Sequence, residues 1–298
     1  MDVIATTGLS LNYGNRMGIA SVDLQVAQGE IFGFLGPNGA GKTTTIRILL
    51  GFLKSTQGSA RIFDQNCWTH SAEIKRSVGY LPGDLRLYPW FTGKKALSIA
   101  SSIRGKNLSS FGKDLLERFQ LDGNIPVRKM SRGMRQKLGI VLALVHEPKL
   151  IILDEPTSAL DPLMCDELYR CLRESVSSGA TVFFSSHTLS EVELLCSRVA
   201  IVRSGRIIAD ETMDALRKRV HRSVVLRFQE AEQAEQAELP SFLLLEQRNG
   251  KVCQCVLTGT TPQLIAWATH QPLEDLSVSP PSLESLFRRF YEPQEIGK

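Results

Sequence analysis

The sequence lacks a long hydrophobic run. Its best apolar stretch, Leu138 to Val145, spans eight residues and contains Gly139, whereas a helix needs about 18 apolar residues to cross a bilayer. The first residues, MDVIATTGLS, show no positively charged start followed by an apolar segment. We therefore expect no secretion signal and a chain that stays in the cytosol. Any work at a membrane would then require a partner protein.

Paired cysteines and blocks of one charge are also missing. The spacing of the six cysteines fits neither a C-x2-C zinc site nor a disulfide scaffold, so we expect reduced, structural thiols. They are Cys67, Cys165, Cys171, Cys196, Cys253 and Cys255. The formal net charge is only +4, and there is no run of basic residues and no heptad repeat. No nucleic-acid partner is therefore expected.

Short apolar segments alternate with helical patterns over the first two thirds of the chain. Residues 20–35 end in a glycine-rich turn, Leu150 to Leu153 end in two acids, and Thr181 to Phe184 end in SSH. Such alternation is typical of an α/β fold on a parallel sheet, whose ligand lies at the carboxyl ends of the strands. Between about 90 and 145 the apolar spacing becomes helical, which predicts an inserted helical subdomain.

The chain changes character after about residue 218. The segments RSVVLRF, FLLLEQR and KVCQCVL predict strands, and the stretch EAEQAEQAE interrupts them. We therefore predict a large domain over 1–218 and a small α+β domain over 219–298. The last segment places four apolar residues on one helix face: Leu283, Leu286, Phe287 and Phe290. Packing on the domain's own strands is one interpretation of this face, and a dimer or regulatory contact is the other.

The glycine-rich turn matches the pattern G-x-x-x-x-G-K-[ST] between a predicted strand and a predicted helix, the context that this pattern needs. Its residues are Gly36, Pro37, Asn38, Gly39, Ala40, Gly41, Lys42 and Thr43, followed by Thr44. Glycines let backbone N–H groups turn inward around a phosphate. We expect Lys42 to reach the β- and γ-phosphates and the Thr43 hydroxyl to coordinate Mg²⁺. The loop predicts Mg-ATP as the ligand and leaves the task of the protein open.

Two acids follow the apolar strand that ends at Leu153. A carboxylate at the end of such a strand holds the Mg²⁺ of P-loop ATPases, so Asp154 is the candidate metal-directed group. The adjacent Glu155 can accept a proton from a water that attacks the γ-phosphate, which makes it the candidate general base. Taken without the loop, an Asp-Glu pair here would more often mark a strand end or a helix start.

Together these motifs resemble the ATP-binding cassette (ABC) family. The segments that carry the resemblance are LIILDEP, SALD at 158–161, SSH at 185–187 and SRGMRQK at 131–137. Their order also matches, with GYLP at 79–82 after the phosphate loop. The resemblance covers roughly residues 3–218. It implies a P-loop NTPase fold with a mixed sheet core and a helical subdomain, which binds ATP and Mg²⁺ and hydrolyses ATP.

The resemblance suggests roles for three further residues. Tyr13 looks like the aromatic residue that stacks on adenine, although an ordinary core tyrosine is the alternative. His187 looks like the switch histidine that contacts the γ-phosphate, whereas a lone histidine after a strand is usually structural. Asp161 looks like the residue that links the two sites across a dimer.

The family signature Leu-Ser-Gly-Gly-Gln is altered in this chain, which has MSRGM at 130–134. Ser131 and Gly133 remain, and they supply a hydroxyl and a close backbone approach at a helix start. The family pairs the loop of one chain with the signature of the other. The resemblance therefore implies a head-to-tail dimer closed by ATP, with a second cassette subunit as partner and a homodimer as the simplest form.

A second departure lies at Gly83, where most cassettes have a glutamine that touches Mg²⁺ and the attacking water. Glycine cannot do that. Asp84 could take over this metal contact, and a solvated loop carboxylate is the alternative. Exposed aromatics follow in the loop Leu85 to Phe91. In the family this region meets the transmembrane partner, but burial of Trp90 and Phe91 in the helical subdomain is an equal alternative.

The resemblance implies the ATP-binding and hydrolysing subunit of a transporter, peripheral on the inner face of the cell membrane, which energises a separate transmembrane permease through dimer closure. The segment PSLESLF resembles the appended domain of single-cassette exporters of the drug-resistance type, which favours export. A nucleic-acid cassette would carry a coiled-coil insertion or a second cassette. A soluble P-loop kinase or GTPase would lack Ser131 of the signature and the switch-like His187. The sequence does not identify the transported substrate.

Overall fold

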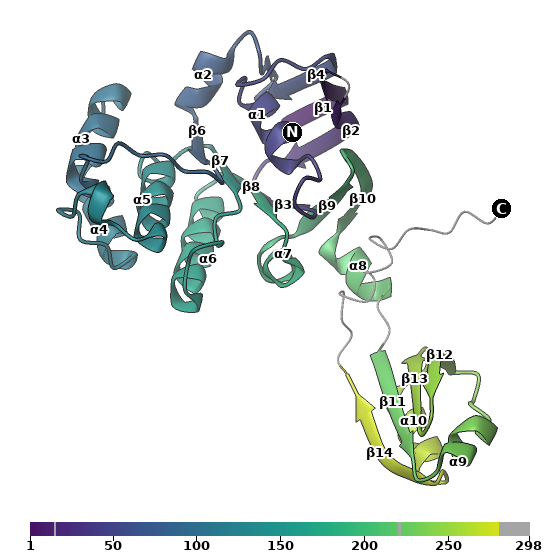
Figure 1. Ribbon diagram of the computed structural model, residues 1–298. Helices are drawn as coiled ribbons and strands as arrows, with labels where there is room; N and C mark the ends of the chain where they lie inside the picture. The colour runs from purple at the N-terminus through teal and green to yellow at the C-terminus, as the bar shows by residue number, and fades with distance from the viewer. Residues whose placement is uncertain (15, 220–221, 280–298) are drawn as a thin grey trace. The chain divides into compact units, whose positions relative to one another are not determined.

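The chain divides into two units, and each has buried hydrophobic side chains of its own. The structure, a computed structural model, describes residues 1–14, 16–219 and 222–279. One cluster of buried side chains lies in the unit Met1–Met213, and another lies in the unit that starts at Asp214. Figure 1 shows the helices and strands of both units. Within the described ranges, no helix combines the length and the apolar character needed to cross a membrane.

An antiparallel sheet with the strand order β2-β1-β4-β5 lies in the first unit. Its strands are β1 (Asp2–Tyr13), β2 (Arg16–Ala27), β4 (Gln57–Ile62) and β5 (Gln65–Asn66). Buried and exposed residues alternate along much of β2, as expected when one face of a sheet packs on the core and the other meets solvent. The sheet carries Tyr13 at the end of β1, close to the phosphate loop.

The main sheet has the order β10-β9-β3-β8-β7-β6, and only β10 runs antiparallel to its neighbour. Its strands are β3 (Ile31–Leu35), β6 (Val78–Leu81), β7 (Leu150–Asp154), β8 (Thr181–Ser186), β9 (Arg198–Arg203) and β10 (Arg206–Thr212). Every residue of β3, β7 and β8 is buried, because parallel strands are covered on both faces. Leu35 pairs with Ser186, and Asp154 pairs with Ser185. The glycine-rich turn, the two acids after Leu153 and the SSH segment therefore meet at the carboxyl ends of these parallel strands.

Some helices connect the strands of the two sheets, and three others form a separate group beside the main sheet. The helices along the chain are α1 (Lys42–Leu49), α2 (Ser71–Arg76), α6 (Pro162–Ser177), α7 (Leu189–Leu195) and α8 (Met213–Arg219). Residues 90–145 contain α3 (Gly93–Arg104), α4 (Ser109–Arg118), the 3-10 turn η1 (Val127–Lys129) and α5 (Arg132–Leu144). The helices α3, α4 and α5 pack on one another, on the side of the main sheet away from the antiparallel sheet (Figure 1). The predicted α/β fold with a mixed sheet and a helical subdomain is confirmed.

The second unit is a four-stranded antiparallel sheet with two helices. Its elements are β11 (Arg222–Phe228), α9 (Ala231–Gln236), β12 (Leu243–Asn249), β13 (Val252–Leu257), α10 (Thr261–Ala268) and β14 (Leu273–Val278). The strand order β12-β13-β11-β14 makes this a ferredoxin-like βαββαβ arrangement. The predicted α+β composition is confirmed, although the sequence analysis missed α10 and β14. The four apolar residues predicted on a last helix lie outside the described residues: Leu283, Leu286, Phe287 and Phe290.

The boundary between the two units falls at helix α8. Residues up to Met213 make most of their contacts within the first unit, and residues from Asp214 make most of theirs within the second, so the division lies at the start of this helix. The domain boundary expected after residue 218 falls near the end of the same helix and stays a prediction.

Candidate nucleotide-hydrolysis site

The phosphate loop joins the buried strand β3 to helix α1. Gly41, the residue before the helix, has φ +106°, a left-handed conformation that residues with a side chain rarely adopt. A Cβ added at Gly36 would lie 2.4 Å from the carbonyl oxygen of Val202, so no side chain fits at this turn. The strand, loop and helix follow one another as the sequence predicted. The N-terminal N–H groups of α1 therefore stand where an anion is stabilised.

Lys42, the first residue of α1, is buried. Its ammonium donates hydrogen bonds to the carbonyl oxygens of Gly36 at 2.6 Å and Pro37 at 3.2 Å. It also lies 2.9 Å from Glu155 Oε1. That oxygen accepts no hydrogen bond from the described residues, so the contact is an ion pair without hydrogen-bond geometry. Lys42 can exchange these oxygen partners for phosphate oxygens, which carry more charge.

Asp154, the last residue of β7, is 1% exposed. The Thr43 hydroxyl donates to its Oδ2 at 2.7 Å, and the Ser185 hydroxyl donates to its Oδ1 at 3.0 Å. Thr43 and Asp154 thus place two hard oxygens side by side, which fits the oxygen ligands of Mg²⁺. In the part of the chain that the structure describes, no three His, Cys, Asp or Glu residues cluster to hold a metal ion. A magnesium ion here would draw further ligands from nucleotide phosphates, as Mg²⁺ commonly does.

Glu155 occupies a strained position between two cationic or polar partners. Its φ is +53°, an uncommon conformation for a residue with a side chain, and such strain clusters at functional sites. Its N–H donates to the Ser185 carbonyl oxygen at 3.1 Å. One carboxylate oxygen pairs with Lys42, and the other contacts Nδ1 of the half-exposed His187. The structure therefore brings together Lys42, Asp154, Glu155 and His187, as the sequence analysis expected of one site.

A pocket of about 630 Å³ opens over these residues, lined by Thr43, Asp154, Glu155 and His187 among others. Burial and the negative charge of Asp154 raise the pKa of Tyr80, another lining residue, to about 12, so its phenol stays protonated. The sequence analysis did not select three arginines that also line the pocket: Arg47, Arg86 and Arg132. Arg47 and Arg86 lie outside the motifs, so no local pattern singled them out, whereas Arg132 lies inside the altered signature at 130–134, where the departure from the family consensus was a signal.

Tyr13 lines a second pocket of about 370 Å³ next to the phosphate loop. It is 47% exposed, so the alternative of an ordinary core tyrosine does not hold. Its hydroxyl lies 3.4 Å from Thr44 Oγ1. Lys42 and Thr43 line the same pocket. An aromatic face beside a phosphate-binding loop suits a nucleobase, and stacking on adenine stays a prediction.

Gly83 lies against the metal-directed carboxylate. A Cβ at this position would sit 3.4 Å from Asp154 Oδ2, which is an ordinary contact distance, so a side chain fits there. Asp84 also lines the pocket, but its carboxylate accepts two hydrogen bonds from Arg86 and both side chains are exposed. This favours the alternative of a solvated loop carboxylate over a metal contact for Asp84.

These contacts predict how the missing glutamine affects hydrolysis. Gly83→Gln should lower the Mg²⁺ concentration needed for half-maximal ATPase activity, because an added oxygen ligand would sit beside Asp154. Asp84→Asn should change the rate by less than about twofold, as expected for an exposed ion pair. Phosphate release measured over a Mg²⁺ titration tests both. A large loss of activity in Asp84→Asn would assign the metal contact to Asp84 instead.

The signature residues lie at the start of helix α5. The Ser131 hydroxyl caps this helix by accepting a hydrogen bond from the N–H of Met134 at 3.2 Å. A Cβ at Gly133 would lie 2.7 Å from the carbonyl oxygen of Ala159, so the SALD segment packs directly on the signature. The buried side chain of Gln136 donates to the Pro156 carbonyl oxygen at 2.8 Å. The signature and the segment after Glu155 therefore form one packed structure.

Asp161 caps the next helix, α6. Its Oδ1 accepts a hydrogen bond from the N–H of Met164 at 3.0 Å, and Pro162 follows at the first helical turn, as is common at helix starts. Its other oxygen lies 3.9 Å from Lys137 Nζ on the signature helix. Asp161 thus links α5 to α6 within one chain. Its predicted role across a dimer stays a prediction.

Comparisons with known proteins decide the family. The pattern of the family described as "ABC transporter" matches residues 19–158. The bacitracin transport ATP-binding protein BcrA of Bacillus licheniformis is 40% identical over 220 residues, which cover 73% of this chain and 72% of BcrA. The chain belongs to the ABC transporter ATP-binding proteins. It is an ATP-binding and ATP-hydrolysing subunit, and the residues gathered around Lys42 belong to an ABC cassette.

Two further similarities support this assignment of the cassette. The Nod factor export ATP-binding protein I of Ralstonia nicotianae is 34% identical over 212 residues, covering 70% of this chain and 66% of that protein. A solved ATP-binding subunit of an ABC transporter superposes with a TM-score of 0.67 and 31% identity, over 72% of this chain and 92% of the other. The relatives thus share the cassette, and they include export-type proteins.

Proposed function

We propose that this cassette hydrolyses Mg-ATP in a head-to-tail homodimer at the inner face of the cell membrane, and that the closing dimer drives a separate permease that exports its substrate. One observation carries the proposal: Asp154, Glu155 and His187 line one pocket, and Lys42, which lines the neighbouring pocket, pairs with Glu155. We also propose that the C-terminal residues 219–298 form an accessory domain.

The chemistry follows from the partners of Glu155. Binding of ATP would let Lys42 exchange its pairing with Glu155 for phosphate oxygens, which frees the carboxylate to accept a proton from water. His187, in contact with the other oxygen, would hold the carboxylate in one orientation. Thr43 and Asp154 would hold Mg²⁺, which would neutralise charge on the phosphates.

The proposed dimer would bring the signature residues of one chain to the nucleotide pocket of the other. Ser131 and Gly133 lie at a helix N-terminus, where the positive end of the dipole favours an anion. In the head-to-tail arrangement they would face the γ-phosphate bound to the other chain. Closure would then depend on ATP, and hydrolysis would reopen the two chains.

An exposed aromatic cluster is the proposed contact with the permease. The ring of Tyr88 lies near those of Trp90 and Phe91 in tilted orientations, with ring centroids 5.3 Å and 5.0 Å apart, and Phe91 is half-buried. Trp90 is 68% exposed, so burial inside the helical subdomain does not account for it. Single exposed aromatic residues are common on protein surfaces and need no explanation. A group of them in one loop is typical of an interaction site. The names of the relatives support export. The relatives are named for different transported molecules, so we propose that the permease, and not the cassette, selects the substrate.

Membrane association in the native host tests this proposal. The tagged chain should sediment with the inner membrane only when its permease is present, and it should co-purify with that permease. Trp90→Ala should weaken the association about tenfold, as expected of a central aromatic contact, without changing the ATPase rate of the isolated chain. Trp68→Ala is the matched control, since Trp68 is also exposed, at 48%. Membrane binding that does not depend on a permease would argue against the proposal.

A further inference from the structure

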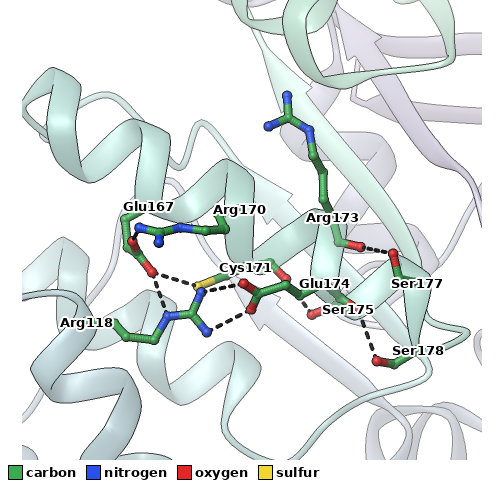
Figure 2. A network of polar contacts seen from close by, with 9 residues as sticks. All are labelled: Arg118, Glu167, Arg170, Cys171, Arg173, Glu174, Ser175, Ser177 and Ser178. Carbon is green, nitrogen blue, oxygen red and sulfur yellow. Dashed lines mark hydrogen bonds and ion pairs between the residues drawn. The ribbon is translucent and has the colours of Figure 1, made fainter.

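A group of ion pairs joins helix α4 to helix α6 outside the nucleotide pocket (Figure 2). Arg118, the last residue of α4, donates from Nε to Glu167 Oε1 at 2.6 Å. Its two terminal nitrogens donate to both carboxylate oxygens of Glu174, at 2.8 Å and 3.1 Å. One guanidinium thus holds two carboxylates that lie about two helical turns apart on α6.

One of these carboxylates is buried and has several donors. The Glu167 side chain is 6% exposed, and it also contacts Arg170 and accepts a hydrogen bond from the Cys171 thiol at 3.7 Å (Figure 2). Burial raises the pKa of Cys171 to about 11, so the thiol remains protonated and able to donate. The hydrogen bond to Glu174 raises the pKa of Arg118. Leaving a buried carboxylate such as Glu167 without Arg118 would be costly.

Close packing of the helices does not make this link. The helices α3, α4 and α5 pack on one another, whereas α4 and α6 approach each other at few points. A cavity of about 740 Å³ adjoins Arg118 and Glu174 and extends to Leu144 and Lys149, where α5 leads into β7. The ion pairs of Arg118 therefore bridge the helical subdomain and the core beside an open space.

The helices that Arg118 connects carry different parts of the proposed dimer site. Helix α4 packs on α5, which begins after the signature residue Ser131, and α6 begins after its cap Asp161. We propose that Arg118 is a positioning residue: it fixes the signature helix relative to α6 and so sets the alignment that ATP-driven dimer closure requires. This inference rests on the proposed function, because it needs Ser131 to act across the dimer.

The arrangement separates two properties that Arg118 could affect. Lys42 and Thr43 make their contacts in the core and none with Arg118, so binding of ATP to one chain should not depend on it. Dimer closure, by contrast, needs the signature helix and the core in register. It should therefore depend on Arg118. In the Glu155→Gln background, Arg118→Met should leave ATP affinity unchanged and weaken Mg-ATP-dependent dimerisation about tenfold.

A second variant distinguishes alignment from stability. Arg118→Met removes one of the two cationic partners of the buried Glu167 and leaves Arg170 as the other, so it should lower the melting temperature. Adding Glu167→Gln removes the buried charge that has lost this partner, so the double variant should recover part of the stability while its dimer stays weak. Lys113→Met is the matched control, because Lys113 lies on α4 and, among the residues that the structure describes, forms its ion pair with the exposed Glu117 of the same helix. It should change neither property.

Sedimentation velocity with Mg-ATP gives the dimer constant, and thermal melting gives the stability. Weak dimers in both Arg118 variants, with normal dimers in Lys113→Met, support the positioning role. If dimerisation recovers together with stability in the double variant, or is unchanged in Arg118→Met, the role of Arg118 is structural and the inference is wrong. A Glu155→Gln parent that does not dimerise would instead overturn the proposed dimer, and this inference with it.

Discussion

Glu155→Gln should reduce steady-state ATP hydrolysis by about 100-fold or more while leaving ATP binding intact. Loss of a positioned general base costs rates of this order, and glutamine has nearly the same shape as glutamate but cannot accept the proton. Lys42 would also lose its ion-pair partner at 2.9 Å, which leaves the ammonium free for phosphate. We therefore expect Mg-ATP to trap a stable dimer of this variant.

Phosphate release and size-exclusion chromatography in Mg-ATP measure the two effects of Glu155→Gln. Glu147→Gln is a matched control, because Glu147 is also a carboxylate with left-handed backbone, at φ +50°, but it does not line the nucleotide pocket. It should hydrolyse ATP at the wild-type rate. Wild-type activity in Glu155→Gln would remove Glu155 from the role of general base.

Lys42→Ala should lower the affinity for ATP about 100-fold. Removing one partner of a buried, hydrogen-bonded charge contact costs this much or more, and the ammonium of Lys42 is the buried cation of the phosphate loop. Glu155 would then lack its cationic partner, so some loss of thermal stability should accompany the loss of binding.

Equilibrium binding of a fluorescent ATP analogue, with competition by ATP, measures the loss in Lys42→Ala. Lys95→Ala, an exposed lysine on α3 outside both nucleotide pockets, is the control and should bind normally. Unchanged ATP affinity in Lys42→Ala would mean that the phosphates bind elsewhere, and the account of the loop would be wrong.

The sequence predicted those parts of the site that depend on local order and on sheet topology. The residues from Gly36 to Thr43 are contiguous, so their pattern is visible without a structure. Asp154 and Ser185 follow adjacent parallel strands, and parallel strands bring their carboxyl ends together. Their pairing in register and the hydrogen bond of 3.0 Å between them agree with that expectation.

The contacts between distant elements could not be predicted. Arg118 and Glu167 come from different helices, and the spacing of charges along a helix says which residues share a face but not which helix they meet. The strained φ of Glu155 likewise depends on the surrounding fold. A signal for α10 was present, since Thr260 and Gln263 form a capping box. No residue of the edge strand β14 is fully buried, so its sequence carries no clear alternation of buried and exposed positions.

The central claim is that two chains share each ATP site, and mixing two inactive variants tests it most directly. Lys42→Ala removes the loop function and Ser131→Arg blocks the signature. Each variant alone should be inactive, because every site in its homodimer carries the defect. In a mixed dimer the intact loop of the Ser131→Arg chain meets the intact signature of the Lys42→Ala chain. We predict that co-assembly restores ATP hydrolysis to a fraction of the wild-type rate. Wild-type activity in Ser131→Arg alone, or a mixture as inactive as its parents at every ratio, would contradict the shared site.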